Sequence, residues 1–356
     1  MAHGTWHMAH GLILSSESLS HNKPKFVILG YPYWGITPAA EAWGALMAKK
    51  AESKCLKFLL RIHKSHKLNS ICELPCKGIW DSTFFDTSKI NSEDDIYFLT
   101  FGNFPLTYSR NYLAHLKSKY RNSRLVRCFM NPIAGPHVYE LQSWNDVKDC
   151  YDAAITMNRR DAENYGFLFC EYWPALLPDK DFEAEKASDV FFCGAAKDRL
   201  NKILDVYEFL TASGLKCDFY ITGVPRNEQK YPDAIHYTEE VTNHWLSYDD
   251  ICQKDKNTKC VLEILPFGQN YSSLRVCEAL WYHKKLLTTN LEAPREWFYH
   301  PETVQCFTDA QDIDTEFIRQ PLSREDEQRI FGSMNIGDFG VFAEWIIKNV
   351  GNHSQS

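Results

Sequence analysis

The chain has 356 residues, of which 44% are hydrophobic and 14% aromatic, and its formal net charge is −7. This composition is typical of a folded protein, and the length favours two domains over one compact core. The negative charge argues against a general nucleic-acid binder, so we expect no nucleic-acid partner. No apolar run reaches the roughly 18 residues that cross a bilayer, and the run at residues 11–14 is too short for a signal peptide.

Cysteine usage indicates a reducing compartment. Several of the twelve cysteines lie within predicted strands, where a thiol behaves as a small core hydrophobe: Cys128, Cys193, Cys217 and Cys260. Cys72 and Cys76 are the closest pair, and no histidine or second cysteine pair follows them at zinc-finger spacing. We therefore expect a cytoplasmic protein without a metal site.

The first elements follow in chain order. Residues 1–22 read as a leader or tag followed by a disordered start. A buried strand is expected at residues 25–31, and Pro38 stands at a typical first helical position, leading a helix that runs to residue 50. The apolar run 55–62 fits either a strand or a helix.

Residues 63–94 are polar and irregular, and their sequence predicts neither a helix nor a strand. After them, strands and helices alternate regularly. The elements expected next are strands at 95–101, 125–130 and 151–157 and helices at 108–120, 145–149 and 158–166. Residues 172–187 hold two prolines and a cluster of charges, and they form the expected interdomain linker. The second half has expected strands at 189–193, 216–222, 235–238, 258–265 and 286–289 and helices at 199–211, 248–254, from 274 onward and at 341–350. This alternation predicts an α/β protein with parallel, doubly wound sheets.

The stretch Val261–Asn290 is the part of the chain that is most informative about function. It reads as a strand, a loop that contains Gly268, a helix and another strand. Ser272 and Ser273 are both possible N-caps of that helix. A glycine loop that opens onto a helix leaves free backbone N–H groups and the positive end of the helix dipole, which suit a phosphate.

Two charged residues of this helix strengthen the phosphate interpretation. Arg275 lies in the first turn, where a cation and the dipole repel each other, so an anionic partner explains it better than helix stability does. Glu278 follows one turn later, where a carboxylate could accept hydrogen bonds from ribose hydroxyls. An ordinary βαβ unit of a parallel sheet remains the alternative.

A second glycine turn, with Gly194, Lys197 and Arg199, follows a strand and precedes a helix in the same half of the chain. Alone it is a weak signal, since lysine and arginine at such a turn are more often solvated surface charge. Together the two stretches place Lys197, Arg199 and Arg275 at the carboxyl edge of one sheet, where ligands gather in such folds. We expect a diphosphate to meet them there.

These stretches resemble a known family. The run SDVFFCGAAKDRLNKILDVYEFLTASGLKCDFYITGVP, followed by IHYTEE and by ILPFGQNYSSLRVCEALWYHKKLLTTN, is similar to bacterial glycosyltransferases of the GT-B fold. Within them it resembles the lipopolysaccharide and capsular polysaccharide biosynthesis proteins. The upstream run YDAAITMNRRDAENYGFLFCEYWPALLP is similar to the close of their first domain. The likeness covers roughly residues 151–301.

The resemblance implies an α/β protein of GT-B architecture, in which two Rossmann-like domains face each other across a cleft. The first domain, expected at 23–176, would hold the acceptor, and the second, at 177–338, would hold a nucleotide-sugar. Residues 339–356 would form a C-terminal helix that crosses back to the first domain.

The resemblance also assigns roles to residues by position. The residues that would contact the donor and its diphosphate are Gly194, Lys197, Arg199, Gly268, Gln269, Asn270, Ser272, Ser273 and Arg275. Glu278 would hold the ribose, and Tyr237 and Tyr248 would contact the base, for which uracil is the expectation. Many retaining members carry a second glutamate eight residues before the ribose-binding one, and here that position is Asn270. An amide can still bind sugar hydroxyls, but the retaining stereochemistry loses its main sequence support.

The expected chemistry needs no cofactor. Departure of a nucleoside diphosphate develops negative charge, which fixed cations and a helix dipole stabilise, so we expect no metal. The Asp-x-Asp triplets at 179–181 and 312–314 read as solvated charge. An inverting enzyme would need a base for the acceptor hydroxyl, and the candidates, each more readily structural, are Asp81, Asp86 and His137. In the acceptor cleft, Tyr33, Trp34 and Gly35 follow the first strand, and the aromatic faces could stack on a sugar or pack in a core.

Three functions fit these features. The first is a hexosyltransferase that moves a sugar from a nucleoside diphosphate sugar to a saccharide or lipid-linked saccharide acceptor in surface polysaccharide biosynthesis. The second is a sugar-nucleotide 2-epimerase on the same fold, and the third is a non-catalytic nucleotide-sugar-binding scaffold. The aromatic residues of the first half favour the first. Peripheral contact with the inner face of the cytoplasmic membrane stays open, although no amphipathic basic helix stands out.

Overall fold

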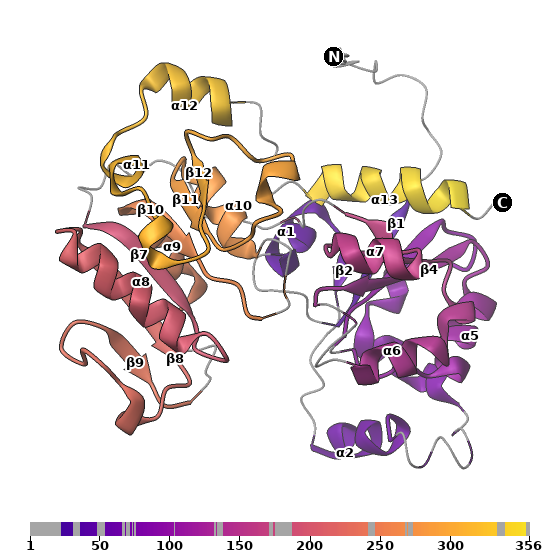
Figure 1. Ribbon diagram of the computed structural model, residues 1–356. Coiled ribbons are helices and arrows are strands. Elements are labelled where there is room, and N and C mark those ends of the chain that lie inside the picture. Colours follow the sequence, from indigo (N-terminus) through magenta and orange to yellow (C-terminus); the bar gives the residue numbers. More distant parts are fainter. Residues whose placement is uncertain are drawn as a thin grey trace.

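Two six-stranded parallel sheets form the protein (Figure 1). The computed structural model describes residues 23–30, 36–47, 54–65, 68, 72, 74, 76–102, 104–131, 133, 138–170, 174, 187–240, 246–267, 269, 273–332 and 339–353. Each sheet has a buried hydrophobic cluster on both of its faces. The α/β class and the doubly wound sheets that the alternation predicts are confirmed.

The first sheet has the strand order β2–β1–β3–β4–β5–β6, and every pair in it is parallel. Its strands are β1 (Lys25–Leu29), β2 (Leu46–Met47), β3 (Ile96–Thr100), β4 (Ser123–Phe129), β5 (Ala153–Thr156) and β6 (Leu168–Phe169). All residues of β3 and all but the first of β1 are buried. Because both faces are covered, these strands are continuous apolar runs without alternation.

The helices of the first domain begin and end at local signals. They are α1 (Ile36–Trp43), α2 (Lys54–His63), η1 (Lys77–Trp80), α4 (Asp81–Phe84), η2 (Thr87–Lys89), α5 (Arg110–Lys119), α6 (Val138–Asn145), η4 (Lys148–Cys150) and α7 (Arg159–Tyr165). The Asn158 side chain caps α7 by accepting a hydrogen bond from Asp161 N at 3.1 Å. Gly166 ends α7 with a φ of 69°, which glycine adopts without strain. The helix expected at 158–166 is therefore confirmed.

Two expectations in the first domain need correction, and one open alternative is settled. The helix expected from Pro38 to residue 50 is α1, which ends at Trp43 because Gly44 adopts a φ of 98°, and the chain then forms β2. The helix expected at 145–149 lies earlier, as α6, and only a 3₁₀ turn follows it. The run 55–62, which fitted a strand or a helix, is the helix α2, and it is amphipathic with cations along its length.

The second sheet has the strand order β12–β11–β10–β7–β8–β9, again with parallel pairs. Its strands are β7 (Ser188–Ala195), β8 (Cys217–Thr222), β9 (His236–Thr238), β10 (Thr258–Glu263), β11 (Lys285–Thr288) and β12 (Val304–Cys306). Its helices are α8 (Leu200–Ala212), η5 (Arg226–Glu228), α9 (Tyr248–Lys256), α10 (Leu274–Trp281), η6 (Ala293–Arg295), η7 (Ala310–Asp312), α11 (Thr315–Arg319) and α12 (Arg324–Phe331). The strands and helices expected here all form, and β12, α11 and α12 were not predicted.

The C-terminal helix α13 (Phe339–His353) packs against the first sheet. Phe339, Phe342, Ile346 and Val350 are buried in the same cluster as apolar residues of β1, β3 and β4. Figure 1 shows α13 lying along the first domain, although the chain reaches it from the second. Two doubly wound domains with a helix that returns to the first have the GT-B architecture that the resemblance implies, and this expectation is confirmed.

An ion pair joins the two domains. Arg159 Nη2, at the start of α7, lies 3.3 Å from Glu296 Oε1, which follows η6 in the second domain. The Arg159 guanidinium also lies over the Phe169 ring, 4.2 Å from its centroid. The expected domain boundary at residues 176 and 177 lies outside the described residues. None of the described helices is long and apolar enough to cross a membrane.

Candidate functional site

The second sheet has a topological switch point between β7 and β10. From β7 the chain continues through β8 and β9 on one side, and it then returns to the other side of β7 to form β10, β11 and β12. At such a point a crevice opens outside the carboxyl ends of the two strands, and ligands bind there. Gly194, Lys197 and Arg199 close or follow β7, and the described residues 264–267 follow β10, so the fold brings the two loops to the same edge of the sheet.

A hydrogen bond joins the two loops at the crevice. Asp198 Oδ2 accepts from the backbone N–H of Phe267 at 3.0 Å. The Phe267 ring is 93% exposed, so its apolar face points away from the protein core at the rim. The bond therefore holds the loop after β10 beside the loop after β7.

Arg199 is the cation on the α8 side of the crevice. Its Nε donates to Ala195 O at 3.1 Å, and its guanidinium lies 5.8 Å from the centroid of the Phe192 ring. Burial lowers the pKa of Arg199 to about 10, against the opposing effect of the nearby negative charges of Glu263 and Asp198. The side chain therefore keeps its charge at neutral pH. A Cβ atom at Gly194 would lie 2.9 Å from Arg199 Nη2, so the glycine leaves room for the guanidinium.

The N-terminus of α8 supplies further positive potential. Arg199 is its N-cap residue, and no side chain caps the helix, so the first backbone N–H groups keep their dipole toward the β7 loop. Lys197 precedes the helix with a φ of 46° and an exposed side chain. Among the described residues none forms an ion pair with Lys197. The α8 side of the crevice thus combines a helix end with two cations.

On the other side of the switch point, a buried carboxylate organises the start of α10. Ser273 is the N-cap residue, and its side chain accepts from Arg275 N at 3.3 Å. Glu263, the last residue of β10 and only 2% exposed, accepts from Ser273 N at 2.6 Å and from Thr288 Oγ1 at 2.6 Å. Glu263 therefore ties the ends of β10, β11 and α10 together, and Ser273 N is already engaged by a protein group.

Arg275 belongs to a buried cluster between α9 and α10. Its Nη1 lies 2.8 Å from Glu278 Oε2 and 3.4 Å from Asp255 Oδ2. Both carboxylates are fully buried, whereas the Arg275 side chain keeps 16% of its surface exposed. One guanidinium nitrogen is thus anchored, and the side chain still reaches the protein surface.

The charges of this cluster shift each other's pKa values. Burial raises the pKa of Asp255 to about 7 and raises that of Glu278 well above its usual range, and in both cases Arg275 opposes the shift. Burial by itself lowers the pKa of Arg275, but the charges of Glu278 and Asp255 raise it above its ordinary value. Two carboxylates against one arginine therefore retain a proton more readily than in water.

The residues expected to hold the ribose and the base lie in different surroundings. Glu278 has no exposed surface and faces Arg275, so a ribose reaches its carboxylate only if the cluster opens. Tyr248 begins α9 beside this cluster, and burial followed by the charge of Glu278 raises its pKa. Tyr237 lies on β9, two strands from β7, and its hydroxyl donates to Lys230 O at 2.6 Å. The fold brings Tyr248 to the site and leaves Tyr237 at the sheet edge.

The two described candidates for a catalytic base form local structural contacts. Asp81 is 2% exposed, and its Oδ2 lies 2.9 Å from His115 Nε2 and 2.8 Å from Lys119 Nζ on α5. Asp86 caps η2 by accepting from Ser88 N at 3.1 Å. Both carboxylates belong to the first domain, in the segment of the chain before α5, whereas the switch point is in the second domain.

Some of the predicted site residues lie outside the described residues: Tyr33, Trp34, Gly35, His137, Gly268, Asn270 and Ser272. Gln269 is described, and its backbone N–H donates to Pro266 O at 3.1 Å, which closes a turn after β10. The roles expected for all these residues, as catalytic base, acceptor contacts or donor contacts, stay predictions.

Three acidic residues of the site were not predicted: Asp198, Asp255 and Glu263. Glu263 did leave a signal, since a carboxylate inside the apolar run Val261–Leu265 must find hydrogen-bond donors when it is buried. Asp255 lies four residues after Ile251, on the inward face of α9, which is the same kind of signal. Nothing in the local sequence indicates that Asp198 bonds to a loop 69 residues away.

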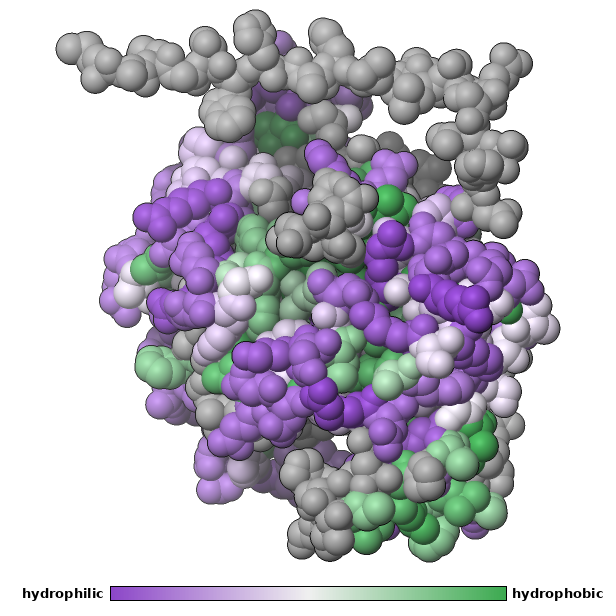
Figure 2. Space-filling view, turned by 90° about the vertical axis from the view of Figure 1, so that its right-hand side faces the viewer, coloured by the Kyte–Doolittle hydropathy of each residue, from purple (hydrophilic) through white to green (hydrophobic). Residues whose placement is uncertain are grey.

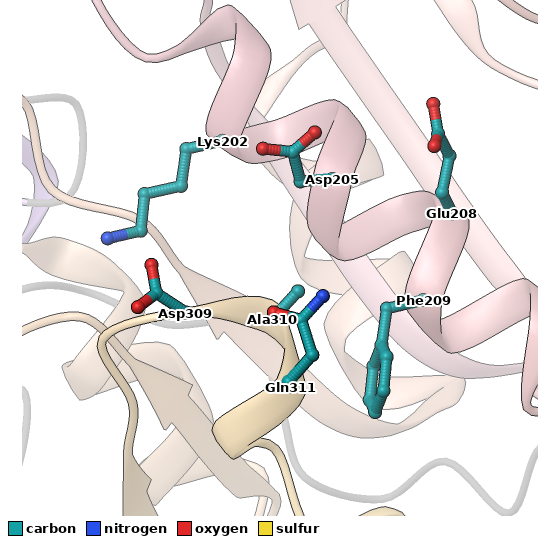
Figure 3. A pocket seen from close by; sticks show the side chains of 7 residues that line it. All are labelled: Lys202, Asp205, Glu208, Phe209, Asp309, Ala310 and Gln311. Atoms are coloured by element: carbon teal, nitrogen blue, oxygen red, sulfur yellow. The ribbon is translucent and has the colours of Figure 1, made fainter.

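A cavity of about 240 Å³ lies between α8 and η7 (Figure 3). Its lining residues are Lys202, Asp205, Glu208, Phe209, Asp309, Ala310 and Gln311. In Figure 3 the amino group of Lys202 points toward Asp309. No predicted site residue lines it, so it is separate from the crevice. Within the described ranges there is no group of three or more side chains that could hold a metal ion.

No protein-family model and no curated protein matches the chain. Among solved structures it is similar to an α-glucosyltransferase in complex with UDP-glucose and DNA containing an abasic site, at 10% identity over 73% of this chain and 81% of that one, with a TM-score of 0.45. It is also similar to a UDP-forming α,α-trehalose-phosphate synthase from Burkholderia xenovorans, at 11% identity over 76% of each chain, with a TM-score of 0.45. A glycosyltransferase involved in avilamycin A biosynthesis has 11% identity over 68% of this chain and 88% of that one, with a TM-score of 0.41. No residue role follows from likeness at this level.

Proposed function

We propose that the protein is a glycosyltransferase that binds a nucleoside diphosphate sugar in the crevice between β7 and β10. The observation that carries this proposal is the pair of arginines, Arg199 and Arg275, which the fold places on the two sides of the switch point. Two buried carboxylates lie against Arg275, and Arg199 donates to Ala195 O, so each guanidinium is oriented before a ligand arrives. Preorganised cations of this kind stabilise charge that develops during a reaction.

The α8 side of the crevice suits the diphosphate. Lys197 is exposed, Arg199 is charged at neutral pH, and the uncapped start of α8 adds backbone N–H groups with the positive end of a dipole. When the bond between the anomeric carbon and the phosphate breaks, negative charge grows on the departing diphosphate. These groups can stabilise that charge without a divalent metal, so we propose a metal-independent transfer.

The finer assignment follows the resemblance. We propose UDP as the carrier and a saccharide or lipid-linked saccharide of surface polysaccharide assembly as the acceptor, bound by the first domain. Tyr248 lies near the cluster of Arg275, and we propose that it serves the base end of the donor.

A thermal-shift panel of nucleoside diphosphates and nucleotide-sugars, with and without EDTA, tests the proposal. Binding to the folded state raises the melting temperature by mass action. We expect a shift with one nucleoside diphosphate that EDTA leaves unchanged and that the Lys197→Ala, Arg199→Ala double variant loses. Lys216→Ala is the matched control, since Lys216 is an exposed lysine away from the crevice. If no nucleotide shifts the wild-type protein, the crevice is only a βα turn and the proposal fails.

Assays of the bound nucleotide-sugar then separate the three functions. A transferase consumes the donor sugar only when an acceptor is present. An epimerase interconverts nucleotide-sugars without an acceptor, and a scaffold binds the donor and leaves it intact.

A further inference from the structure

One exposed apolar surface belongs to the first domain and is separate from the crevice. Of the eight large hydrophobic side chains that are exposed in the described chain, four are Phe58, Leu59, Leu68 and Ile79, at 62%, 39%, 45% and 61% exposure. We call these four residues the α2 surface. Figure 2 shows hydrophobic side chains gathered at the foot of the molecule, the level at which Figure 1 places α2.

The inner side of α2 accounts for its attachment to the domain. Leu60 packs against the buried cluster that contains Trp80 and Phe98 on one face of the first sheet, and His63 Nδ1 accepts a hydrogen bond from Trp80 Nε1 at 3.1 Å. Trp80 is 1% exposed and precedes α4, so α2 is anchored to the body of the domain at its C-terminal end. Ile79, next to Trp80, is thereby held close to that end of the helix.

The outer side of α2 is amphipathic. At about 100° per residue, Cys55, Phe58, Leu59 and Ile62 fall within one arc of the helix, and the first three of them are exposed. The exposed cations Lys54 and Arg61 border this arc, and Lys64 follows the helix. A stripe of apolar side chains with cations at its margin is the arrangement of helices that lie in the interface of a membrane.

The charge of this region contrasts with that of the whole chain. Residues 54–80 contain six lysines and arginines and a single acidic residue, whereas the chain carries a net charge of −7. An anionic surface therefore attracts this segment and repels most of the remaining protein. A protein partner would need a matching acidic rim around an apolar groove, but an anionic bilayer supplies both properties at once.

We propose that the α2 surface docks the protein on an anionic lipid membrane, with Phe58 and Leu59 inserted at the headgroup level and Lys54 and Arg61 paired with lipid phosphates. Contact of this kind leaves the donor crevice of the second domain free. The docking does not depend on nucleotide binding, so it can be tested independently of the proposed function.

Co-sedimentation with vesicles tests the docking. The probes are vesicles of phosphatidylcholine alone and of phosphatidylcholine with phosphatidylglycerol. We expect the wild-type protein to sediment with the anionic vesicles only, and less so as salt is raised. One double variant combines Phe58→Ser and Leu59→Ser, and a second combines Lys54→Glu and Arg61→Glu. Each should lower the bound fraction at least about tenfold.

Matched controls lie on the second domain. Leu291→Ser removes another side chain of 61% exposure, and Lys216→Glu with Lys230→Glu reverses two exposed lysines. Both controls should bind vesicles like the wild type. Thermal unfolding of every variant shows whether the fold persists, and the wild-type salt and lipid dependence tests the proposal even where a variant does not fold.

Three results would overturn the proposal. The first is absence of wild-type binding to anionic vesicles, and the second is equal loss in the control variants. The third is a wild-type protein that binds no vesicles and runs as a dimer in gel filtration, while the Phe58→Ser, Leu59→Ser double variant runs as a monomer. The α2 surface would then be a contact between two copies of the chain. The nucleotide panel is read separately, so failure of the donor site leaves this test intact.

Discussion

Arg275 Nη1 lies 2.8 Å from Glu278 Oε2, one turn further along α10. The same nitrogen lies 3.4 Å from Asp255 on α9, so two fully buried carboxylates share one guanidinium. Removing one partner of such a buried pair typically costs about 3–5 kcal/mol, because a buried charge is left uncompensated. The cluster therefore joins α9 to α10 and orients Arg275 at the same time.

The first prediction concerns pH. Burial raises the pKa of Asp255 to about 7, above its ordinary value, and it raises that of Glu278 in the same direction. A carboxyl that binds its proton more tightly when folded stabilises the fold fully below its ordinary pKa, and this contribution is lost as the pH rises through about 7. We expect the Asp255→Asn variant to gain stability relative to the wild type as the pH rises.

Urea unfolding at a series of pH values measures this difference. Asp205→Asn, at an exposed position on α8, is the control and should leave the pH dependence of the wild type unchanged. Parallel curves for the wild type and Asp255→Asn would show that Asp255 holds no proton in the folded protein near neutral pH.

The second prediction concerns Lys197. Its side chain is exposed, so Lys197→Ala should leave the free energy of unfolding unchanged while it weakens nucleotide binding. A charge-assisted hydrogen bond contributes about 1.5–3 kcal/mol, and the loss in affinity should be of that size by calorimetry. Lys216→Ala serves as the matched control. Normal affinity in Lys197→Ala would take this lysine out of the site.

The third prediction couples Gly194 to Arg199. A Cβ atom at Gly194 would lie 2.9 Å from Arg199 Nη2, and the guanidinium would have to move. We expect Gly194→Ala to weaken nucleotide binding in the wild-type background and to add little in an Arg199→Ala background. A double-mutant cycle on the dissociation constants measures this coupling. Additive effects would mean that the methyl group acts on the ligand or the backbone and not through Arg199.

The fourth prediction concerns Glu263. Its carboxylate accepts from Ser273 N and from Thr288 Oγ1, both at 2.6 Å. A glutamine has only one acceptor oxygen, so Glu263→Gln should leave a buried donor unsatisfied and lower stability by about 1–3 kcal/mol. Chemical denaturation measures the loss, with the exposed Glu228→Gln as the control. Wild-type stability in Glu263→Gln would show that another group satisfies these donors.

The fifth prediction concerns the returning helix. Phe342 of α13 is 1% exposed in the cluster that covers one face of the first sheet. Phe342→Ala should therefore lower the free energy of unfolding by about 3–5 kcal/mol. Glu344→Ala, on the exposed side of the same helix, should change it little. If both variants unfold alike, α13 contributes no core packing to the first domain.

Much of the fold could be predicted because its signals are local. Strand β3 is a continuous apolar run, Asn158 and Gly166 bound α7, and Ser273 caps α10 with its own side chain. Each of these preferences depends on residues a few positions apart, so it is legible in the sequence. The α2 run shows the limit, because a short apolar segment of this kind fits a strand as well as a helix.

The sequence by itself therefore determined the alternation of strands and helices, the two glycine turns and the cations Lys197, Arg199 and Arg275. Tertiary structure alone decided that β7 and β10 are neighbours, because strand order depends on the packing of distant segments. It also decided that Asp255 of α9 is buried on the nitrogen of Arg275 that meets Glu278, and that α2 turns Phe58 outward. The contact between α9 and α10 and the exposure of Phe58 depend on how distant segments pack, and no spacing along the chain encodes them.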